Sequence, residues 1–495
     1  MSNNTRVLLI NPPQRYFEKS ADFDVYFPIG LISIASYIKN ICNIKIMDCL
    51  IEDFSIKKNK DQYIYGTPSK NIENKIKEFR PNIVGISAPF STQKESVREI
   101  ISTCRKLDKN MIIIVGGPDA TIRYEEILKE NDCDFCILGE GEKTFFELIR
   151  RYQTHKNLKN IKGVAYKTNK RVKYNPNELI ENLDELGLLD YDLLDMNKYL
   201  NNKRLYKARN HTSKKSISII TSRGCPYNCV FCSVKTHMGK KFRSQSPDMV
   251  LKHIKMCVEK YGIRSFHFED DNIAFDRRRF EQILDNIIDS DLKISWNVPN
   301  GIHVNSLDHR ILKKIKKSGC EELTIAIESG NQRVLNNIIR KNLSLKKVLE
   351  VVKECKKLRI RLKAFYVIGF PGESKEDIQT TMKFAIKLLR EYEVIPSMMF
   401  ATPIYGTELY NIALRKQLIN KKFTDEELSN ATQIYGEPLI KSEEYSKEWL
   451  KKEANKYIKI LRRELFVYSI KHPLYAIKKL EKQTKVIKEI FKRRN

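Results

Sequence analysis

Long apolar runs are missing from this 495-residue sequence. No stretch approaches the roughly 18 consecutive apolar residues of a membrane-spanning helix, so we expect no such helix. Residues 1–20 contain no apolar core of the kind that a secretion signal needs. The chain has 11 cysteines, an odd number, which without a secretion signal favours a reducing compartment over a set of disulfides. We therefore expect a cytoplasmic protein and leave association with a membrane surface open.

Acidic residues are scarce relative to basic ones. The chain has 90 Lys and Arg against 61 Asp and Glu, a net charge of +29. No compact motif that combines aromatic and basic residues accompanies this charge, so we expect no nucleic-acid partner. The charge fits a solvated basic surface, while an anionic substrate, an acidic reductant or a membrane surface stays open as a partner.

A fourth metal ligand is missing from the most distinctive motif of the chain. Cys225, Cys229 and Cys232 follow a strand-like run, residues 216–221, with the spacing C-x3-C-x2-C. No further pair of Cys or His follows at zinc-site spacing, and a disulfide does not suit a reducing compartment. Ordinary electron-transfer clusters use four cysteines. Three cysteines therefore predict a [4Fe-4S] cluster in which one iron is left open for chemistry.

Strand-like and helix-like segments alternate in two separate parts of the chain. Such alternation predicts parallel sheets covered by helices, an α/β fold. We expect a Rossmann-like (flavodoxin-like) domain over residues 1–152, a linker with a small β segment over 153–215, a partial (β/α)6 barrel of the TIM type over 216–410, and a helical, basic C-terminal region over 411–495. Within the first domain, residues 49–70 are expected to form an insertion or an irregular loop.

Glycine and polar residues gather where the predicted strands end. In folds of this kind ligands bind beyond the carboxyl ends of the strands. The strand ends of the first part carry Ser87, Gly116, Gly117, Gly139 and Glu140. Those of the second part carry Asp270, Asp271, Glu328, Ser329, Gly369, Phe370, Pro371 and Gly372. Glycines that merely form tight turns are the alternative for any one of these positions.

Residues 216–410 resemble the radical S-adenosylmethionine (SAM) enzymes, whose hallmark is C-x3-C-x2-C with an aromatic residue, here Phe231, before the last cysteine. The resemblance implies that the open iron of the cluster binds the amino and carboxylate groups of S-adenosylmethionine. It also implies, by position, the residues that bind this cofactor: Phe231, Asp270, Asp271, Glu328, Ser329, Gly369, Phe370, Pro371 and Gly372.

Residues 1–152 resemble the B12-binding domain of the cobalamin-dependent radical SAM enzymes. The strand IVGIS and the strand ends V-G-G-P and G-E-G-E carry the resemblance. It implies a cobalamin pocket lined by Ser87, Gly116, Gly117, Gly139 and Glu140. Classical B12 domains place D-x-H-x-x-G after the first strand, but residues 11–16 are N-P-P-Q-R-Y here. Cobalamin is therefore expected to bind without a protein histidine on cobalt, unless the domain has lost the cofactor.

The resemblance implies an enzyme that methylates an unactivated carbon of a biosynthetic intermediate. Its substrate would be a small molecule or lipid-like, and a flavodoxin- or ferredoxin-type protein would supply electrons. A cyclase, a ring-rearranging or an oxidising enzyme of the same family is the alternative, and a non-catalytic cobalamin or redox sensor is a third. The residues that act on the substrate itself stay unassigned.

Several further residues have two interpretations. Cys133 and Cys136 form a C-x2-C, but they belong to an apolar strand region and are expected to be buried core thiols. Arg243 either pairs with a carboxylate or lies on the surface. His237 follows the cysteine motif closely enough to contact the site. Residues 464–494 mix apolar residues with lysines, so they form either a helix packed on the barrel or a basic amphipathic helix that contacts a membrane surface.

Overall fold

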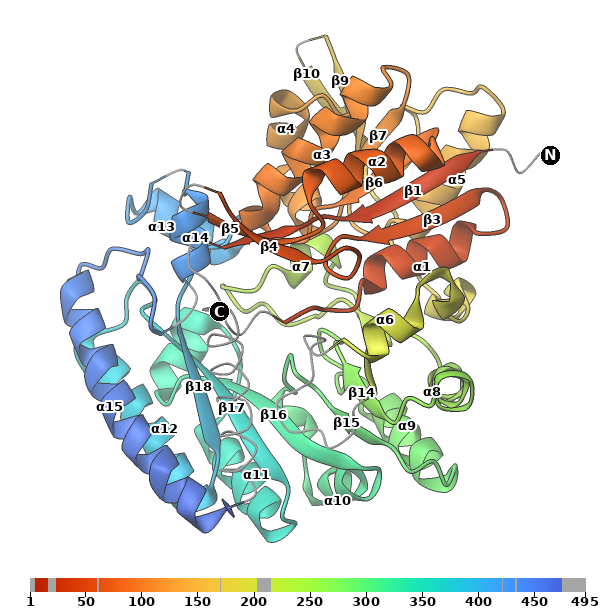
Figure 1. Ribbon diagram of the computed structural model, residues 1–495. Helices are drawn as coiled ribbons and strands as arrows, with labels where there is room; N and C mark the ends of the chain where they lie inside the picture. Colours follow the sequence, from red (N-terminus) through yellow and green to blue (C-terminus); the bar gives the residue numbers. More distant parts are fainter. Residues whose placement is uncertain are drawn as a thin grey trace, which may run out of the picture.

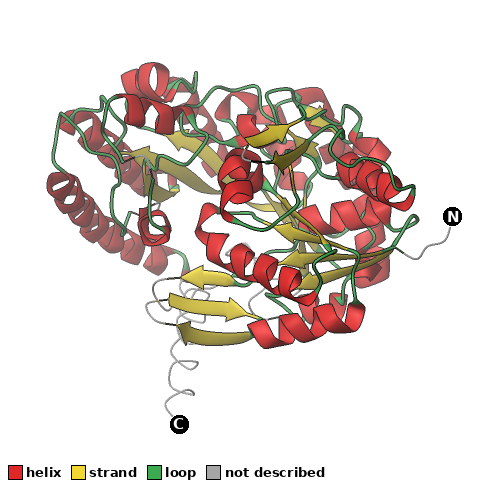
Figure 2. Ribbon diagram, turned by 90° about the horizontal axis from the view of Figure 1, so that it is seen from above, coloured by secondary structure: helices red, strands yellow, loops and turns green. Residues whose placement is uncertain are grey.

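The computed structural model describes residues 5–16, 24–59, 62–169, 171–202, 215–420, 422–431 and 434–473. Within these residues two large sheets, each flanked by helices, form the two halves of the molecule (Figures 1 and 2). The N-terminal half is the upper one in Figure 1, and the C-terminal half lies below it.

Seven strands form the first sheet, in the order β10-β9-β8-β7-β6-β1-β3. Its parallel strands are β1 (Arg6–Asn11), β3 (Asn43–Asp48), β6 (Ile83–Ser87), β7 (Ile112–Gly116) and β8 (Phe135–Ile137). Counted along the chain, these parallel strands lie in the order 2-1-3-4-5, which is that of flavodoxin-like folds. The order reverses between β1 and β6, and ligands of such folds bind beyond that point. The predicted Rossmann-like fold is confirmed.

Helices cover both faces of this sheet: α1 (Ile29–Ile38), α2 (Ser69–Phe79), α3 (Lys94–Leu107), α4 (Pro118–Glu130) and α5 (Glu142–Gln153). Successive side chains of a strand point to opposite faces. Val7 and Leu9 of β1 accordingly share a buried cluster with α1 and α5. Leu8 and Ile10 share another with α2, α3 and α4. The interior of a strand buried on both faces is apolar, and the run of residues 7–10 made β1 easy to recognise in the sequence.

Two short β segments differ from the sequence expectation. The predicted hairpin of the linker, β9 (Val164–Thr168) and β10 (Arg171–Tyr174), is present, but β9 pairs antiparallel with β8 and so extends the first sheet. Residues 49–70, expected to be irregular, contain β4 (Ser55–Asn59) and β5 (Gln62–Gly66). With β2 (Gln14–Tyr16) they form a three-stranded antiparallel sheet. Tyr65 anchors this sheet in a small core of its own, too small to leave a periodic signal in the sequence.

The second sheet is a partial barrel. Its strands, all parallel and in sequential order, are β11 (Ser216–Ile219), β14 (Ser265–Phe268), β15 (Ser295–Asn297), β16 (Cys320–Glu328), β17 (Arg361–Ile368) and β18 (Ile395–Phe400). The helices between them are α8 (Pro247–Tyr261), α9 (Arg277–Asp289), α10 (His309–Lys317), α11 (Leu345–Lys357) and α12 (Lys375–Tyr392). The predicted incomplete (β/α)6 barrel is thereby confirmed. Figure 1 shows these helices outside the curved sheet.

Shorter elements connect the two halves and complete the barrel. They are the helices α6 (Met196–Leu200) and α7 (Val234–His237), the paired strands β12 (Ser222–Arg223) and β13 (Arg243–Ser244), and the π-helix Val334–Ile339. The 3-10 turns are Ser91–Gln93, Leu183–Leu186, Tyr191–Leu193 and Val304–Ser306. Tyr191 is buried in the core that the two halves share.

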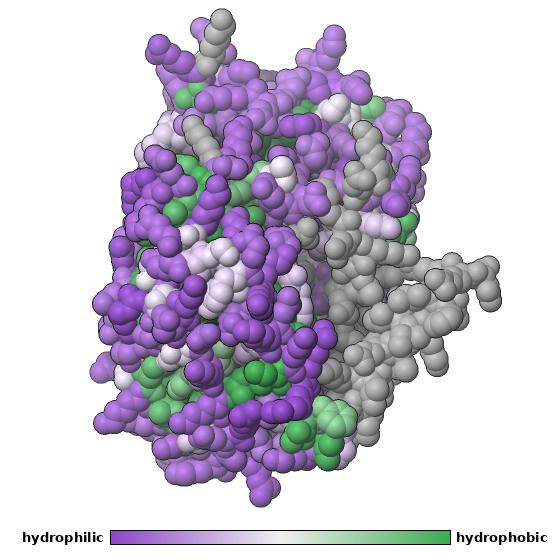
Figure 3. All heavy atoms as spheres, turned by 90° about the vertical axis from the view of Figure 1, so that its left-hand side faces the viewer, coloured by the Kyte–Doolittle hydropathy of each residue, from purple (hydrophilic) through white to green (hydrophobic). Residues whose placement is uncertain are grey.

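Helices α13 (Glu408–Arg415), α14 (Asp425–Ala431) and α15 (Lys447–Lys471) follow the barrel. Leu450, Ala454 and Tyr457 of α15 are buried in the core cluster that contains residues of α12, so the first part of α15 packs on the barrel. The predicted basic segment 464–494 lies largely outside the described residues. Figure 3 shows this side of the molecule as mainly hydrophilic, with small apolar patches. No helix among the described residues is long and apolar enough to cross a membrane.

Candidate active site

The cysteine motif forms a loop between β12 and α7, at the end of the barrel that faces the first sheet. Gly224 opens this loop with a φ of +81°, and a Cβ atom added there would lie 2.3 Å from the backbone oxygen of Lys241. Only glycine fits such a position without displacing the neighbouring backbone. The ring of Tyr227 stacks on His303, with 4.1 Å between the ring centroids. The N–H of Val230 donates to the backbone oxygen of Ile339 (3.1 Å). Contacts with the barrel thus hold the loop from several sides.

The three cysteines of this loop carry free, partly buried thiols. Burial raises the pKa of Cys229 to about 11 and that of Cys232 to about 12. These thiols therefore keep their protons until a metal displaces them, as metal-coupled thiolate sites do. No group of three or more His, Cys, Asp or Glu side chains in the described part of the chain is arranged to hold a single metal ion. In a four-iron cluster each cysteine binds a different iron, so the three sulfurs need not converge on one point.

Two of the predicted cofactor residues, Asp270 and Asp271, hold the backbone of the cysteine loop. One carboxylate oxygen of Asp270 accepts hydrogen bonds from the N–H (3.1 Å) and the hydroxyl (2.8 Å) of Thr221. A carboxylate oxygen of Asp271 accepts one from the N–H of Gly224 (3.0 Å). Burial raises the pKa of Asp271 to about 6. The structure therefore brings both residues to the cluster loop, where they support its entry.

Glu328 lies at the end of β16 with a φ of +70°, next to an irregularity in the register with β17. Its carboxylate accepts a hydrogen bond from Nζ of Lys341 (2.8 Å), and both side chains are about 6% exposed. The charge of Lys341 also acts on Cys229. The hydroxyl of the neighbouring Ser329 is fully buried and is hydrogen-bonded to that of Thr381 (2.8 Å). Lys341 was missed in the sequence because one lysine stands out little in a lysine-rich chain.

The turn Gly369–Gly372 follows β17 and lies close to the cluster loop. The rings of Phe370 and Phe231 are 6.0 Å apart, between centroids. The backbone N–H groups of Gly369 (2.7 Å) and Phe370 (2.8 Å) both donate to the buried carboxylate of Glu373. Burial raises the pKa of Glu373 to about 8. These two N–H groups are therefore occupied by the protein itself, and Glu373 is a structural residue of the turn that the sequence pattern does not reveal.

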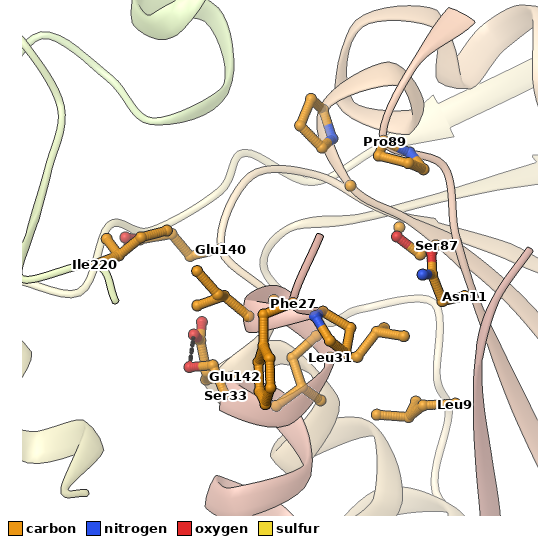
Figure 4. Close-up of a pocket in the computed structure, with 18 of the residues that line it drawn as sticks. Leu9, Asn11, Phe27, Leu31, Ser33, Ser87, Pro89, Glu140, Glu142 and Ile220 are labelled. Atoms are coloured by element: carbon orange, nitrogen blue, oxygen red, sulfur yellow. Dashed lines mark hydrogen bonds between the residues drawn. The ribbon is translucent and has the colours of Figure 1, made fainter. Parts of the chain in front are cut away.

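A cavity of about 460 Å³ lies beyond the carboxyl ends of the first sheet. All five residues predicted to bind cobalamin line it: Ser87, Gly116, Gly117, Gly139 and Glu140. Asn11 and Ser87 border it at the point where the strand order reverses, and Figure 4 shows both beside Leu9, Phe27 and Leu31. The cavity extends to Ser218, Ile220 and Glu269 at the end of the barrel. It therefore lies between the two halves of the molecule.

The walls of this cavity fit a bulky ligand that is held without a histidine from the segment after the first strand. Gly116 leaves room for a Cβ atom, because the nearest atom to one added there would be Cβ of Ile137 at 3.9 Å, an ordinary van der Waals distance. The position of the missing histidine is Pro13. Two residues earlier, the side-chain amide of Asn11 donates to Asp48 (2.8 Å). Two other histidines reach the cavity, His237 and His253. Nε2 of His253 is hydrogen-bonded to the hydroxyl of Tyr191 (2.8 Å), so that ring is engaged in the core.

Comparisons with known proteins identify both halves of this arrangement. Residues 219–385 match the radical SAM superfamily, and residues 23–149 match the B12 binding domain. An uncharacterized methyltransferase of Pyrococcus horikoshii is 32% identical over 416 residues, which are 84% of this chain and 84% of that protein. The cytidylyl-2-hydroxyethylphosphonate methyltransferase of Streptomyces wedmorensis is 27% identical over 470 residues, 88% of this chain and 85% of that protein.

A solved structure shows the same fold. OxsB, a cobalamin-dependent S-adenosylmethionine radical enzyme with aqua-cobalamin and S-adenosylmethionine bound, superposes with a TM-score of 0.70 at 16% identity, over 99% of this chain and 71% of that one. Fold and cysteine loop thus define a radical SAM protein joined to a B12-binding domain. The chain belongs to this B12-binding branch of the radical SAM superfamily. It is an enzyme of that class, and both relatives above are methyltransferases.

Proposed function

We propose that this enzyme transfers a methyl group to an unactivated carbon of a small molecule, using a [4Fe-4S] cluster, S-adenosylmethionine and cobalamin. The observation that carries the proposal is the shared cavity. It is lined on one side by the five predicted cobalamin residues and on the other by the ends of β11 and β14. Arg223, which lines it too, directly precedes the cysteine loop. A substrate at this place would lie between the two cofactor sites.

The residues of the chain divide into those that hold the cofactors and those that support them. Cys225, Cys229 and Cys232 would bind the cluster, while Asp270 and Asp271 support its loop. For S-adenosylmethionine we propose the walls around Phe231, Asp270, Asp271, Glu328, Ser329 and the turn Gly369–Gly372. When bound, the cluster, S-adenosylmethionine and cobalamin supply reductive cleavage of the sulfonium, hydrogen abstraction and a methyl donor. The protein contributes position and exclusion of water, since the cavity is lined largely by apolar side chains.

The partners and the division into domains are proposals of the same kind. A flavodoxin- or ferredoxin-type protein fits as electron donor, because the net charge of +29 favours an acidic partner. Pairing of β9 with β8 favours placing residues 1–174 in the first domain rather than 1–152. The linker would then end at residue 215, followed by the barrel over 216–410 and the helical region over 411–495.

The reaction type is tested by product analysis after anaerobic reconstitution with iron, sulfide, hydroxocobalamin and a strong reductant. Cytidylyl-2-hydroxyethylphosphonate, named in the relative from Streptomyces wedmorensis, is the first compound to try, followed by small-molecule extracts with methyl-labelled S-adenosylmethionine. Methyl transfer predicts 5′-deoxyadenosine, S-adenosylhomocysteine and labelled product together. Deoxyadenosine and a changed but unlabelled product would replace methylation by cyclisation, rearrangement or oxidation. Absence of S-adenosylmethionine cleavage would favour a non-catalytic cobalamin or redox sensor.

Filling the cavity at Gly116 is expected to abolish cobalamin binding while the fold persists. Gly116 has no positive φ, and a Cβ added there would make only an ordinary van der Waals contact, so a leucine there needs no backbone change. Its side chain would occupy volume that the ligand needs. We expect Gly116→Leu to weaken hydroxocobalamin binding by at least about 30-fold, or about 2 kcal/mol. Gly116→Ala, which adds one methyl group, serves as the matched control and should bind within a few-fold of the parent.

Absorbance titration with hydroxocobalamin measures both variants, and thermal unfolding without ligand checks that each is folded. Equal affinities of the parent and folded Gly116→Leu would place the ligand elsewhere.

A further inference from the structure

A network of buried charges joins the cavity wall to the cysteine loop. Glu140, in the turn after β8, and Arg243 of β13 form an ion pair in which one guanidinium nitrogen donates to both carboxylate oxygens at 2.7 Å. Both side chains are about 1% exposed. The N–H of Ile180 donates to the same carboxylate (2.7 Å), and its carbonyl accepts from Arg243 (2.9 Å). The carboxylate-partner alternative for Arg243 is confirmed, and Glu140 is engaged by the protein.

A second pair extends this network to the residue before Gly224. Nη2 of Arg223 donates to Glu142 (2.6 Å), and Nη1 bridges to Glu140 (3.0 Å). Ser33 of α1 donates to the same oxygen of Glu142 (2.6 Å), as Figure 4 shows. Burial would raise the pKa of Glu142, but the charge and hydrogen bonds of Arg223 outweigh it and lower the pKa. We call Glu140, Glu142, Arg223 and Arg243 the charge clamp. It contains equal numbers of positive and negative groups.

The position of the charge clamp sets what it can do. Glu140 lies in the turn before α5, and Glu142 is the first residue of α5. Both line the cavity on the side of the first sheet. Arg223 and Arg243 face each other in the β12–β13 pair, the base from which the cysteine loop starts. Nη2 of Arg243 also donates to the carbonyl of Met238, at the end of α7 behind the loop (2.7 Å). A displacement of either half of the molecule would therefore break buried charged hydrogen bonds, each strong in such surroundings.

We propose that the charge clamp holds the cluster loop at a fixed position against the cobalamin cavity, so that occupation of one cofactor site favours occupation of the other. The proposal rests on the cofactor sites of the proposed function. We treat the members of the charge clamp as positioning residues, because their side chains are engaged with one another, although Glu140, Glu142 and Arg223 also line the cavity. Assembly of the cluster orders the loop and hence Arg223, and an ordered Arg223 fixes the cavity wall at Glu142. Coupling between two binding equilibria is reciprocal, so it is measurable from either side.

Hydroxocobalamin affinity in the presence and absence of the cluster tests the coupling. The parent is compared after reconstitution with iron and sulfide and as the cluster-free Cys229→Ala variant, both by absorbance titration. We expect the cluster to tighten hydroxocobalamin binding by about fivefold or more, within the usual range of such coupling. Glu142→Gln keeps the size of the side chain and removes its charge. In a protein that carries Glu142→Gln we expect weaker hydroxocobalamin binding. We also expect the ratio of the affinities with and without the cluster to be near one.

A double variant and a control separate positioning from simple stability. Glu142→Gln leaves the buried guanidinium of Arg223 with one charged partner fewer, whereas Glu142→Gln/Arg223→Gln removes both charges and retains the pair of Glu140 with Arg243. The double variant should regain stability towards heat but not the coupling, because breaking one side of a buried pair costs more than removing both. Lys143→Met is the matched control. It breaks the neighbouring, half-exposed pair of Lys143 with Glu185 and should leave the ratio unchanged.

Each outcome decides the proposal. The proposed coupling would be overturned if the parent had the same hydroxocobalamin affinity with and without the cluster. It would also be overturned if the Glu142→Gln protein kept the parent's ratio of these two affinities. A parent that binds no hydroxocobalamin would instead overturn the cofactor of the proposed function. If Glu142→Gln does not fold, Arg223→Lys replaces it. A lysine keeps the charge but lacks the fork that bridges Glu140 and Glu142, so the ratio should fall there as well.

Discussion

The Cys229→Ala protein is expected to contain no intact [4Fe-4S] cluster and to cleave no S-adenosylmethionine. The loop has no spare ligand, because the remaining cysteines of the described residues are buried elsewhere in the cores of the two halves. Removing one thiolate leaves an iron without its protein ligand, and the cluster is then lost or incomplete. Iron and sulfide content, the visible absorption of the reconstituted protein and 5′-deoxyadenosine formation under strong reductant measure the effect.

Cys355→Ala is the matched control for this experiment. Cys355 is a buried thiol on α11, which covers the outside of the barrel, and its loss should cost about 1 kcal/mol of stability without affecting iron content. Full iron content and undiminished S-adenosylmethionine cleavage in Cys229→Ala would contradict the assignment of the cluster. Loss of iron in Cys355→Ala would show that iron content reports general stability, and the assignment would lose its support.

Both sheets were predictable because their strands leave strong local signals. The interiors of strands such as β1 and β6 are buried on both faces and apolar, and helices of ordinary amphipathic pattern lie between the strands. The strand ends carry glycine and polar residues, so the sequence pattern places Gly116 and Gly139 at the edge of the sheet where ligands bind, and the family resemblance implies one pocket for both. The three-stranded sheet over residues 14–66 had no such signal. Its strands are short, none is a continuous apolar run, and a long-range pairing with β2 holds them.

The supporting residues of the site were less predictable than the residues that they support. Arg223 and Glu142 lie 81 positions apart, so their pairing depends on how the two halves meet. Glu373 follows the turn that it organises, but nothing in its spacing shows that its carboxylate accepts the N–H groups of Gly369 and Phe370. Lys341 is one of many lysines. A motif therefore predicts which residues could contact a cofactor, whereas the buried charges that hold those residues become visible only in the folded chain.

The largest effect outside the cysteines is expected from Lys341→Met. The ammonium group of Lys341 is buried against Glu328, and its charge opposes the rise that burial causes in the pKa of Cys229. Reduction adds negative charge at the cluster site, and a buried positive charge nearby stabilises that state. Methionine of similar length removes this charge and leaves the Glu328 carboxylate unpaired. We expect a more negative midpoint potential of the cluster and S-adenosylmethionine cleavage reduced on the order of 100-fold.

Redox titration followed by EPR, together with the rate of 5′-deoxyadenosine formation, measures this prediction. Lys341→Arg retains a positive charge and should keep the potential close to that of the parent, even if its larger side chain lowers stability. Lys341→Met/Glu328→Gln removes the unpaired carboxylate as well, so it should regain thermal stability over the single variant. Its potential should rise from that of the single variant towards that of the parent, because the charge of Glu328 also acts on Cys229. Lys241→Met, which breaks an exposed pair with Glu181 near the same loop, should change neither quantity. An unchanged potential in a folded, cluster-containing Lys341→Met protein would limit Lys341 to a structural partner of Glu328.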